Sequence, residues 1–421
     1  MKALLIKAAK LAKKIIKAIF PASWIKAVMN TIYHWKARKL AAVVKEKQEN
    51  GHKPELPSGV NLIASITGDS GLGQSSRLIA NVLEHSDVPH VIYNYVYSYS
   101  LKMEDTTYAD KISSELPYDI NLVHINPREL GPALFRLPKN MWSSQYNIAF
   151  WLWELEDFPE EWAVYTDLFD EIWTPAEFVS NAVRTAAKCP VHTLPYHVTA
   201  PTEEQYDRAW FGLPEDKFLF AFMYDANSVA DRKNPMAVVK AFMKAFSPEE
   251  TGVGLVIKAN NGRPEDIEKL RRQMRGYENL YFVTDNLKKT AVNSLLKCVD
   301  VFVSLHRAEG FGLGMAESMM VGTPSIATNW SANTEFMNSE VGCMVDYKLI
   351  KLEKDIEPYH KGSRWADADV DQAADYMRRL YLDKAYYRSL SEKGYEYIQK
   401  KLGLEESVKR LEAQVKRIEE R

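Results

Sequence analysis

The chain has 421 residues, more than one hydrophobic core usually organises, and fits two domains of roughly 150–200 residues each. A composition of 46% hydrophobic, 26% charged and 11% aromatic residues excludes large-scale disorder and collagen-like or coiled-coil structure. The net charge of −2 conceals an asymmetry, because residues 1–45 hold eleven Lys and Arg and no Asp or Glu, whereas the rest holds 43 basic and 56 acidic side chains. We therefore expect the N-terminal segment to meet an anionic partner.

The cysteines, Cys189, Cys298 and Cys343, have no metal-ligand spacing, and their odd number argues against a disulfide framework. This usage is typical of a cytoplasmic protein. No apolar run approaches the roughly 18 residues of a membrane span. Lysines between residues 7 and 17 also interrupt any signal-peptide core.

The first twenty residues predict an amphipathic helix that Pro21 ends, followed by a second helical segment at about 22–48. One arc of the first helix carries Lys2, Lys7, Lys10, Lys13, Lys14 and Lys17, and the opposite side carries Leu4, Leu5, Leu11, Ile15, Ile16 and Ile19. Such helices lie in the interface of anionic membranes, so residues 1–48 predict peripheral binding at the inner face of the plasma membrane. Packing on the protein's own body is the alternative. The body has no basic, aromatic stripe that would bind nucleic acid.

After a linker at 53–58, short apolar strands alternate with helices in two successive sets. The expected strands are 60–66, 90–95, 121–125, 148–153, 171–174 and 191–194, then 218–224, 254–258, 280–283, 299–305 and 323–328. This alternation predicts an α/β fold with two parallel, doubly wound, Rossmann-like domains. The expected organisation is a basic helical extension at 1–55, domains at 56–205 and 206–390, and terminal helices at 391–421 that cross back to the first domain.

The first strand leads into Gly68-x-x-Gly71-x-Gly73 and then a helix, an arrangement that brings backbone N–H groups near a phosphate or carboxylate. An ordinary tight turn is the alternative. The spacing differs from the dinucleotide pattern G-x-G-x-x-G, and no acidic partner ends the next strand, which disfavours a nicotinamide-dependent oxidoreductase.

A second glycine-rich segment runs from Ser304 to Glu317 and opens a helix after a buried strand, so its backbone donors can bind an anion. Glu309 follows the strand and Glu317 lies one or two turns into the helix. The two carboxylates can therefore face the reacting end and the far end of one long ligand.

With its E-x7-E spacing and E-G-F-G-L core, this segment resembles the retaining nucleotide-sugar glycosyltransferases of family 4, glycosyl transferases group 1. The run from Met319 to Thr328 is similar to that family's A-x-x-x-G-x-P-V-I-A-T segment. The resemblance implies the GT-B fold, with an acceptor domain at 56–205 and a nucleotide-sugar domain at 206–390 facing an interdomain cleft.

The resemblance also implies roles for the donor-binding residues. Glu317 would bind the donor ribose and Glu309 would lie by the transferred sugar, while the backbone of the next four residues approaches the sugar and diphosphate. Those residues are Gly310, Phe311, Gly312 and Leu313. Gly71, Gly73 and Lys258 are further donor-binding candidates.

Members of the family hold the donor diphosphate with an arginine and a lysine near the start of the second domain. Lys233 matches the lysine, whereas Asn227 stands where the arginine is usual, so Arg232 is the candidate replacement. Two cations there would stabilise the charge that develops on the departing diphosphate.

In the first domain, residues 151–159 resemble the W-x-W-E-x-x-x-F-P form of a bacterial surface-polysaccharide subgroup. Glu154 is a catalytic candidate, and Trp153 and His124 are acceptor-binding candidates, since aromatic faces suit sugars and carboxylates accept hydroxyl hydrogen bonds. Core packing is the alternative for all three. Asp367-Ala368-Asp369 is interpreted as a helix start and not as a metal motif.

These features predict a retaining hexosyltransferase that uses a nucleotide-diphosphate sugar and acts on a glycan or lipid-linked acceptor in cell-surface polysaccharide or glycolipid synthesis. The catalytic candidates are Glu309, Lys233, Arg232 and Glu154, and no metal or cofactor is expected. The alternative is a catalytically inactive GT-B-like glycan-binding or scaffold protein at the membrane. A front-face mechanism and a double displacement through a carboxylate both stay open.

Overall fold

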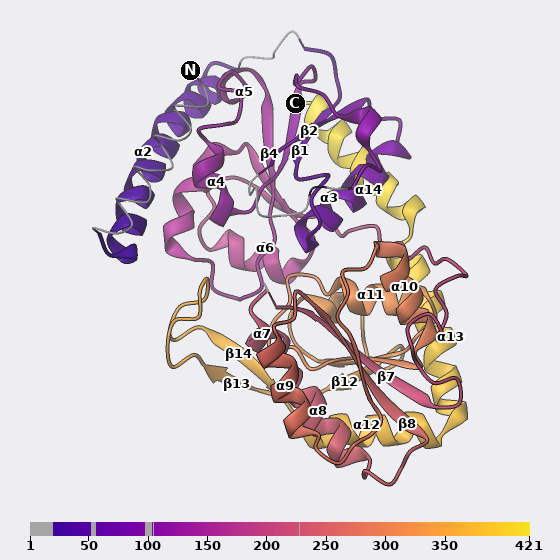
Figure 1. The fold of residues 1–421 in the computed structure, drawn as a ribbon. Coiled ribbons are helices and arrows are strands. Elements are labelled where there is room, and N and C mark those ends of the chain that lie inside the picture. Colours follow the sequence, from indigo (N-terminus) through magenta and orange to yellow (C-terminus); the bar gives the residue numbers. More distant parts are fainter. Residues whose placement is uncertain (1–19, 52–55, 97–102, 104, 227) are drawn as a thin grey trace, which may run out of the picture.

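The computed structural model describes residues 20–51, 56–96, 103, 105–226 and 228–421. It contains two α/β domains, one above the other in Figure 1. Each domain is built on a six-stranded sheet whose strands all run parallel. The predicted α/β, doubly wound fold is confirmed. The helix expected over residues 1–19 lies outside the described residues.

The first sheet has the strand order β2-β1-β3-β4-β5-β6. Its strands are β1 (Val60–Ala64), β2 (His90–Asn94), β3 (Ile120–His124), β4 (Tyr146–Phe150), β5 (Glu171–Thr174) and β6 (Val191–Thr193). Because β2 and β3 lie on opposite sides of β1, the carboxyl ends of β1 and β3 flank the crevice where ligands bind in such sheets.

Helices and 3-10 turns connect the strands of the first domain. They are α3 (Gly71–Glu84), η1 (Ala109–Lys111), α4 (Pro127–Ala133), α5 (Met141–Ser144), η2 (Glu160–Leu168) and α6 (Glu177–Arg184). Helix α3 starts tightly after β1, where the N–H of Gly73 donates to the capping Oγ of Ser70 at 3.1 Å. A Cβ on Gly73 would lie 2.0 Å from the carbonyl oxygen of Gly68, so only glycine fits this turn.

The second sheet has the order β12-β11-β10-β7-β8-β9, which places its crevice between the carboxyl ends of β7 and β10. Its strands are β7 (Phe218–Asp225), β8 (Val253–Asn260), β9 (Leu280–Val283), β10 (Val301–Ser304), β11 (Ser325–Thr328) and β12 (Cys343–Val345). Its connections are α7 (Ala230–Lys233), α8 (Pro235–Ala245), α9 (Pro264–Gln273), α10 (Lys289–Cys298), α11 (Leu313–Met320), η3 (Ala332–Glu335) and α12 (Val370–Leu382). An antiparallel hairpin of β13 (Tyr347–Lys351) and β14 (Arg364–Ala368) follows β12.

The C-terminal helices join the two domains. Helix α13 (Lys384–Leu402) packs on α11 of the second domain, and α14 (Leu404–Glu419) packs on α3 of the first. Figure 1 shows this run in yellow, with α14 beside the upper domain. Leu411, Val415 and Ile418 of α14 are buried in the same core cluster as Leu78 and Val82 of α3.

Helix α2 (Ala22–Glu49) lies along the first domain, at the left of Figure 1, where the sequence predicted a helix at 22–48. Its C-terminal half buries Ala37, Leu40 and Val44 in the core of that domain. This half of α2 therefore packs on the protein's own body, which was the expected alternative to membrane contact.

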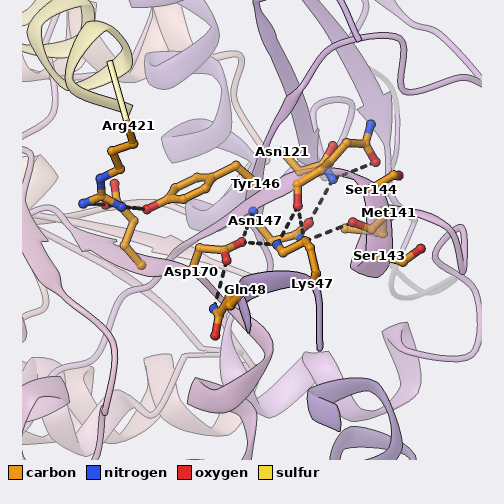
Figure 2. A network of polar contacts seen from close by, with 12 residues as sticks. Lys47, Gln48, Asn121, Met141, Ser143, Ser144, Tyr146, Asn147, Asp170 and Arg421 are labelled. Carbon is orange, nitrogen blue, oxygen red and sulfur yellow. Dashed lines mark hydrogen bonds and ion pairs between the residues drawn. The ribbon is translucent and has the colours of Figure 1, made fainter. Parts of the chain in front are cut away.

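A buried polar network also fastens the C-terminal end of α2 (Figure 2). Lys47 Nζ donates to Asp170 Oδ2 at 2.6 Å and to the carbonyl oxygen of Gln145 at 2.8 Å. Gln48 donates to Asp170 Oδ1 at 2.9 Å, and the N–H of Asn147 donates to Oδ2 at 2.7 Å. Both carboxylate oxygens of Asp170 are thus satisfied within the protein.

Candidate functional site

A cavity of about 520 Å³ lies between the domains, at the carboxyl ends of both sheets. The first domain contributes the turn after β1, from Asp69 to Leu72, and Asn126 after β3. The second contributes the end of β7 and the glycine-rich loop from Glu309 to Met315 after β10. The cavity therefore joins the switch points of the two sheets, where doubly wound folds bind their ligands.

Glu309 is buried at the centre of a charged cluster beside this cavity. Lys233 Nζ donates to its Oε1, and Arg232 Nη1 lies 3.3 Å from its Oε2. Burial alone would raise the pKa of Glu309, but the charges of Lys233 and Arg232 outweigh that effect and hold the pKa at about 2. The carboxylate is therefore ionised at any working pH.

Arg232 is held rigidly, although it lies at the end of a single turn of helix. Its guanidinium donates to the carbonyl oxygen of Ala308 at 2.7 Å and to Ser228 Oγ at 3.1 Å, and it lies 3.7 Å from Glu154 Oε1 of the first domain. Burial acts to lower the pKa of Arg232, but Tyr359, Glu309 and Glu154 more than compensate and raise it. Arg232 therefore links carboxylates of the two domains.

Lys233 lines the cavity beside Arg232 and is its more accessible neighbour. Burial lowers the pKa of Lys233 despite the opposing charge of Glu309. Asn234 follows in the left-handed conformation, with φ of 56°, and donates to the carbonyl oxygen of Leu305 at 3.0 Å. This contact fixes the Arg232–Lys233 turn against the strand that leads to Glu309.

Lys258 of strand β8 and Glu317 of helix α11 also line the cavity. Lys258 Nζ donates to the carbonyl oxygen of Asp285 at 2.8 Å and to Asn260 Oδ1, and burial lowers its pKa to about 8. Glu317 is buried in α11 and pairs at 2.5 Å with Lys289 at the start of α10. Lys289 was missed by the sequence analysis, because no local motif connects it to Glu317.

The glycine-rich loop passes close to the first domain. A Cβ on Gly310 would lie 2.9 Å from the carbonyl oxygen of Trp153, and Gly312 has φ of 100°. Phe311 packs against Tyr196 of the first domain and Phe336 of the second, with ring centroids 5.1 and 5.2 Å away. The loop needs glycine for this approach, which brings the E-G-F-G-L segment against the W-x-W-E segment.

Three predicted site residues do not line the cavity. The N–H of Gly73 is used by the Ser70 cap, and the indole of Trp153 donates to the carbonyl oxygen of Asp157 at 2.8 Å. His124 is buried with Nε2 2.6 Å from Ser75 Oγ, and burial lowers its pKa to about 4, which keeps it neutral. Asp369 caps α12 by accepting from two backbone N–H groups, as expected for a helix start.

The other predicted residues gather around one cavity. Its lining includes Gly71, Glu154, Arg232, Lys233, Lys258, Glu309, Gly310, Phe311, Gly312, Leu313 and Glu317. Its wall carries both acidic and basic side chains, and the second domain contributes four cations, Arg232, Lys233, Lys258 and Lys289. Such a lining suits a long ligand that carries both negative charge and hydroxyl groups.

Two Rossmann-like domains facing a shared cavity define the GT-B fold, and solved structures share it. The chain is similar to HepE of Anabaena, solved in complex with UDP and glucose, with 11% identity and a TM-score of 0.63 over 86% of this chain and 100% of that one. It is similar to sucrose-phosphate synthase of Thermosynechococcus elongatus, with 14% identity and a TM-score of 0.62 over 86% and 99%. It is also similar to a glycosyltransferase from Rickettsia africae, with 12% identity and a TM-score of 0.62 over 86% of this chain and 98% of that one.

Residues 222–356 match the model of the family described as Glycosyl transferases group 1. The matched stretch includes Arg232, Lys233, Lys258, Glu309 and Glu317. A search of curated proteins finds no match. Among the helices that the structure describes, none is long and apolar enough to cross a membrane.

Proposed function

We propose that the chain is a retaining glycosyltransferase that moves a hexose from a nucleotide-diphosphate sugar to a glycan or lipid-linked acceptor in surface-polysaccharide or glycolipid synthesis. The observation that carries the proposal is the charged wall of the interdomain cavity, formed largely by the segment that matches the glycosyltransferase family. HepE, whose fold is shared, is described as a complex with UDP-glucose. The E-x7-E pattern supports retention.

The cavity offers separate places for the parts of such a donor. Lys233 and Arg232 would neutralise the departing diphosphate, aided by Lys258, and Glu317 would accept the ribose hydroxyls. The N–H groups of the loop from Gly310 to Leu313, which opens α11, would bind diphosphate and sugar oxygens. No metal or cofactor enters the proposal.

Glu154 would hold the acceptor hydroxyl, because it lines the cavity from the opposite domain. In a front-face reaction, the bond between the anomeric carbon and the diphosphate oxygen breaks while the acceptor oxygen bonds to that carbon on the same face. The proton of the acceptor hydroxyl passes to the leaving diphosphate. Because Glu309 is ionised and pinned by two cations, it would orient these cations and the sugar.

A panel of UDP, GDP and ADP hexoses tests this function. A matching donor raises the thermal unfolding midpoint, because it binds only the folded protein. Transfer to mixed glycan and polyprenyl-linked acceptors, with the product anomer read by NMR, then tests activity and retention. Midpoint shifts without turnover of any donor would favour the inactive glycan-binding scaffold. The absence of both would contradict the donor site itself.

Lys233→Ala and Glu309→Gln are each expected to lower transfer at least 100-fold. Lys233→Ala removes a cation that would stabilise the departing diphosphate, and Glu309→Gln removes the carboxylate that would orient Arg232, Lys233 and the sugar. The readout is the initial rate under saturating donor, with circular dichroism to verify the fold. Lys240→Ala changes an exposed lysine of α8 and serves as the matched control. Wild-type rates in Glu309→Gln or Lys233→Ala would contradict the site assignment.

We also propose that the protein works on the inner face of the plasma membrane. An exposed stripe runs from Phe20, just before α2, along the N-terminal half of that helix at intervals of four and three residues. Its other members are Trp24, Val28, Ile32 and Trp35. No acidic residue occurs before Glu46, and the stripe adjoins Lys39, which lies 4.8 Å from the ring of Trp35. Tryptophan beside lysine is the chemistry of an interfacial helix on anionic lipid.

Trp24→Ala together with Trp35→Ala should weaken binding to phosphatidylcholine vesicles containing phosphatidylglycerol at least tenfold in a sedimentation assay, because two large apolar side chains are lost from the interface. High salt should weaken binding of the wild type. Trp210→Ala removes an equally exposed tryptophan from the second domain and should have no effect. Binding that resists the double substitution would show that this stripe does not face lipid.

A further inference from the structure

Asn126 stands at the N-cap of helix α4 but does not cap it. The residue directly precedes Pro127, the first residue of α4, and its backbone is extended, with φ of −64° and ψ of 152°. An asparagine in this position usually accepts a hydrogen bond from a backbone N–H of the first helical turn. Here the side chain makes no capping bond to α4, all of whose residues the structure describes. Its polar atoms are therefore used elsewhere.

The side chain instead joins the turn after β3 to the turn after β4. Oδ1 of Asn126 accepts from the N–H of Leu152 at 3.0 Å. A second bond ties the same two turns, because Nε1 of Trp151 donates to the carbonyl oxygen of Ile125 at 3.0 Å. Since a backbone N–H can only donate, the bond to Leu152 identifies which end of the amide is the oxygen. The orientation of Asn126 is thus fixed.

The amide nitrogen of Asn126 is left for a ligand. The residue is half-buried and lines the interdomain cavity, as do Leu152 and Glu154. Its side chain is hydrogen-bonded to the described residues only through Oδ1, so both protons of Nδ2 remain to be used. Because β3 and β4 are adjacent and parallel, the turns that carry Asn126 and Glu154 lie at the same edge of the sheet. A hydrogen-bond donor and a carboxylate thus come from neighbouring turns of the first domain.

We propose that Asn126 is an acceptor-binding residue whose Nδ2 donates to a hydroxyl oxygen of the acceptor sugar, next to the hydroxyl that Glu154 holds. The inference rests on the proposed glycosyltransferase function. A sugar hydroxyl both donates and accepts, whereas an ionised carboxylate only accepts and an amide nitrogen only donates. The two groups together therefore match two neighbouring hydroxyls of one sugar ring.

Asn126→Asp tests this role with a side chain of nearly the same shape. The aspartate keeps an oxygen for the N–H of Leu152 but replaces the amide donor with a second acceptor. With octyl glucoside, octyl galactoside and octyl mannoside as acceptors, we expect the acceptor KM to rise at least tenfold. The donor KM and the thermal shift given by the donor should stay unchanged, and the latter also verifies that the variant is folded.

Two further variants make the test specific. Asn126→Ala adds no charge and should raise the acceptor KM about tenfold, the scale of one hydrogen bond. Asn140→Asp should leave it unchanged and is the matched control, because Asn140 is exposed and occupies the N-cap of α5, likewise without a capping bond to that fully described helix.

An unchanged acceptor KM in Asn126→Asp or Asn126→Ala overturns the inference. A rise confined to Asn126→Asp also overturns it, because the new charge alone would explain that rise, and an equal rise in donor KM would place Asn126 at the donor sugar instead. The proposed function stands in each case, since the wild type still transfers. A wild type that uses none of the three hexosides overturns the inference alone if it uses another acceptor of the mixed panel, and overturns both if it uses none.

Discussion

At the scale of single residues, the site is organised by paired charges. Glu309 binds Arg232 and Lys233, and Glu317 binds Lys289. Each pair is at least partly buried, so its geometry is fixed by the protein and needs little rearrangement when charge develops on a ligand. Lys258 differs, because its neighbours are the carbonyl oxygen of Asp285 and the amide oxygen of Asn260.

The lowered pKa of Lys258 predicts a pH dependence of donor binding. Burial lowers this pKa to about 8, so Lys258 is charged below pH 8 and increasingly neutral above it. An anionic diphosphate binds the charged form better, and the donor Kd should therefore rise above pH 8, by at most tenfold per pH unit. Titration calorimetry between pH 7 and 9.5 measures this change.

Lys258→Arg provides the control, because a guanidinium stays charged throughout this range. The variant should bind the donor with a Kd that no longer rises above pH 8. If the variant and the wild type share the same rise, another group is responsible and Lys258 does not contact the diphosphate.

The separation of interacting residues along the chain explains which site residues could be predicted from the sequence. Glu309, Glu317 and Lys233 lie in short motifs whose spacing is visible in the chain, and the structure brings them to one cavity. Lys289 pairs with Glu317 from another helix, and Arg232 lies 3.7 Å from Glu154 of the other domain. No local pattern encodes either contact.

At the scale of elements, strands with continuous apolar runs were predicted well. All eleven expected strands are present. Most of them are covered on both faces and consist almost entirely of buried residues, whereas β2, β6 and β9 at the sheet edges are only partly buried. Strand β12 is buried but has only three residues, and β13 is mostly exposed, so neither gives a long buried run. The hairpin that carries Tyr359 was missed for this reason.

The C-terminal end of helix α2 is anchored by the buried ion pair between Lys47 and Asp170. Lys47→Ala would leave Asp170 buried without its cation and should lower the free energy of unfolding by about 3 kcal/mol. Urea denaturation followed by tryptophan fluorescence measures the change. Limited proteolysis should also become faster within α2, since this contact anchors the helix end (Figure 2).

Lys45→Ala is the matched control on the same helix. Lys45 is exposed and pairs only with Glu49 one turn away, at 3.6 Å, so its loss should change the free energy of unfolding by no more than about 0.5 kcal/mol. Equal effects of the two substitutions would contradict a special role for the Lys47–Asp170 pair.

At the scale of the whole molecule, the chain passes between the domains twice. It leaves the first domain after β6 and returns through α13 and α14, so that α14 completes the hydrophobic core beside α3. The W-x-W-E segment of the first domain also meets the glycine-rich loop of the second, where Gly310 approaches the backbone of Trp153. The cavity geometry therefore depends on contacts remote from it in sequence.

The returning helix is also fixed by a buried carboxylate. Glu171 in β5 is fully buried, and Arg417 of α14 donates to its two oxygens at 2.7 and 2.9 Å. Trp173 Nε1 and the hydroxyl of Tyr146 also donate to it, at 2.6 and 3.2 Å. A second guanidinium, that of Arg421, lies 3.6 Å from Glu171 Oε2. Neutral donors alone compensate poorly for a buried charge, so the two guanidiniums, with Arg417 the closer, supply most of the stabilisation.

Arg417→Ala should therefore lower the free energy of unfolding by about 2 kcal/mol, less than a fully buried pair would lose because Arg417 is partly exposed. Urea denaturation measures the change. Arg410→Ala on the same helix, which breaks a pair with Glu406 one turn away, should cost no more than about 0.5 kcal/mol. A small, equal cost in both variants would mean that Arg421, Trp173 and Tyr146 satisfy Glu171 without Arg417, and that the Arg417–Glu171 pair does not hold α14 on the first domain.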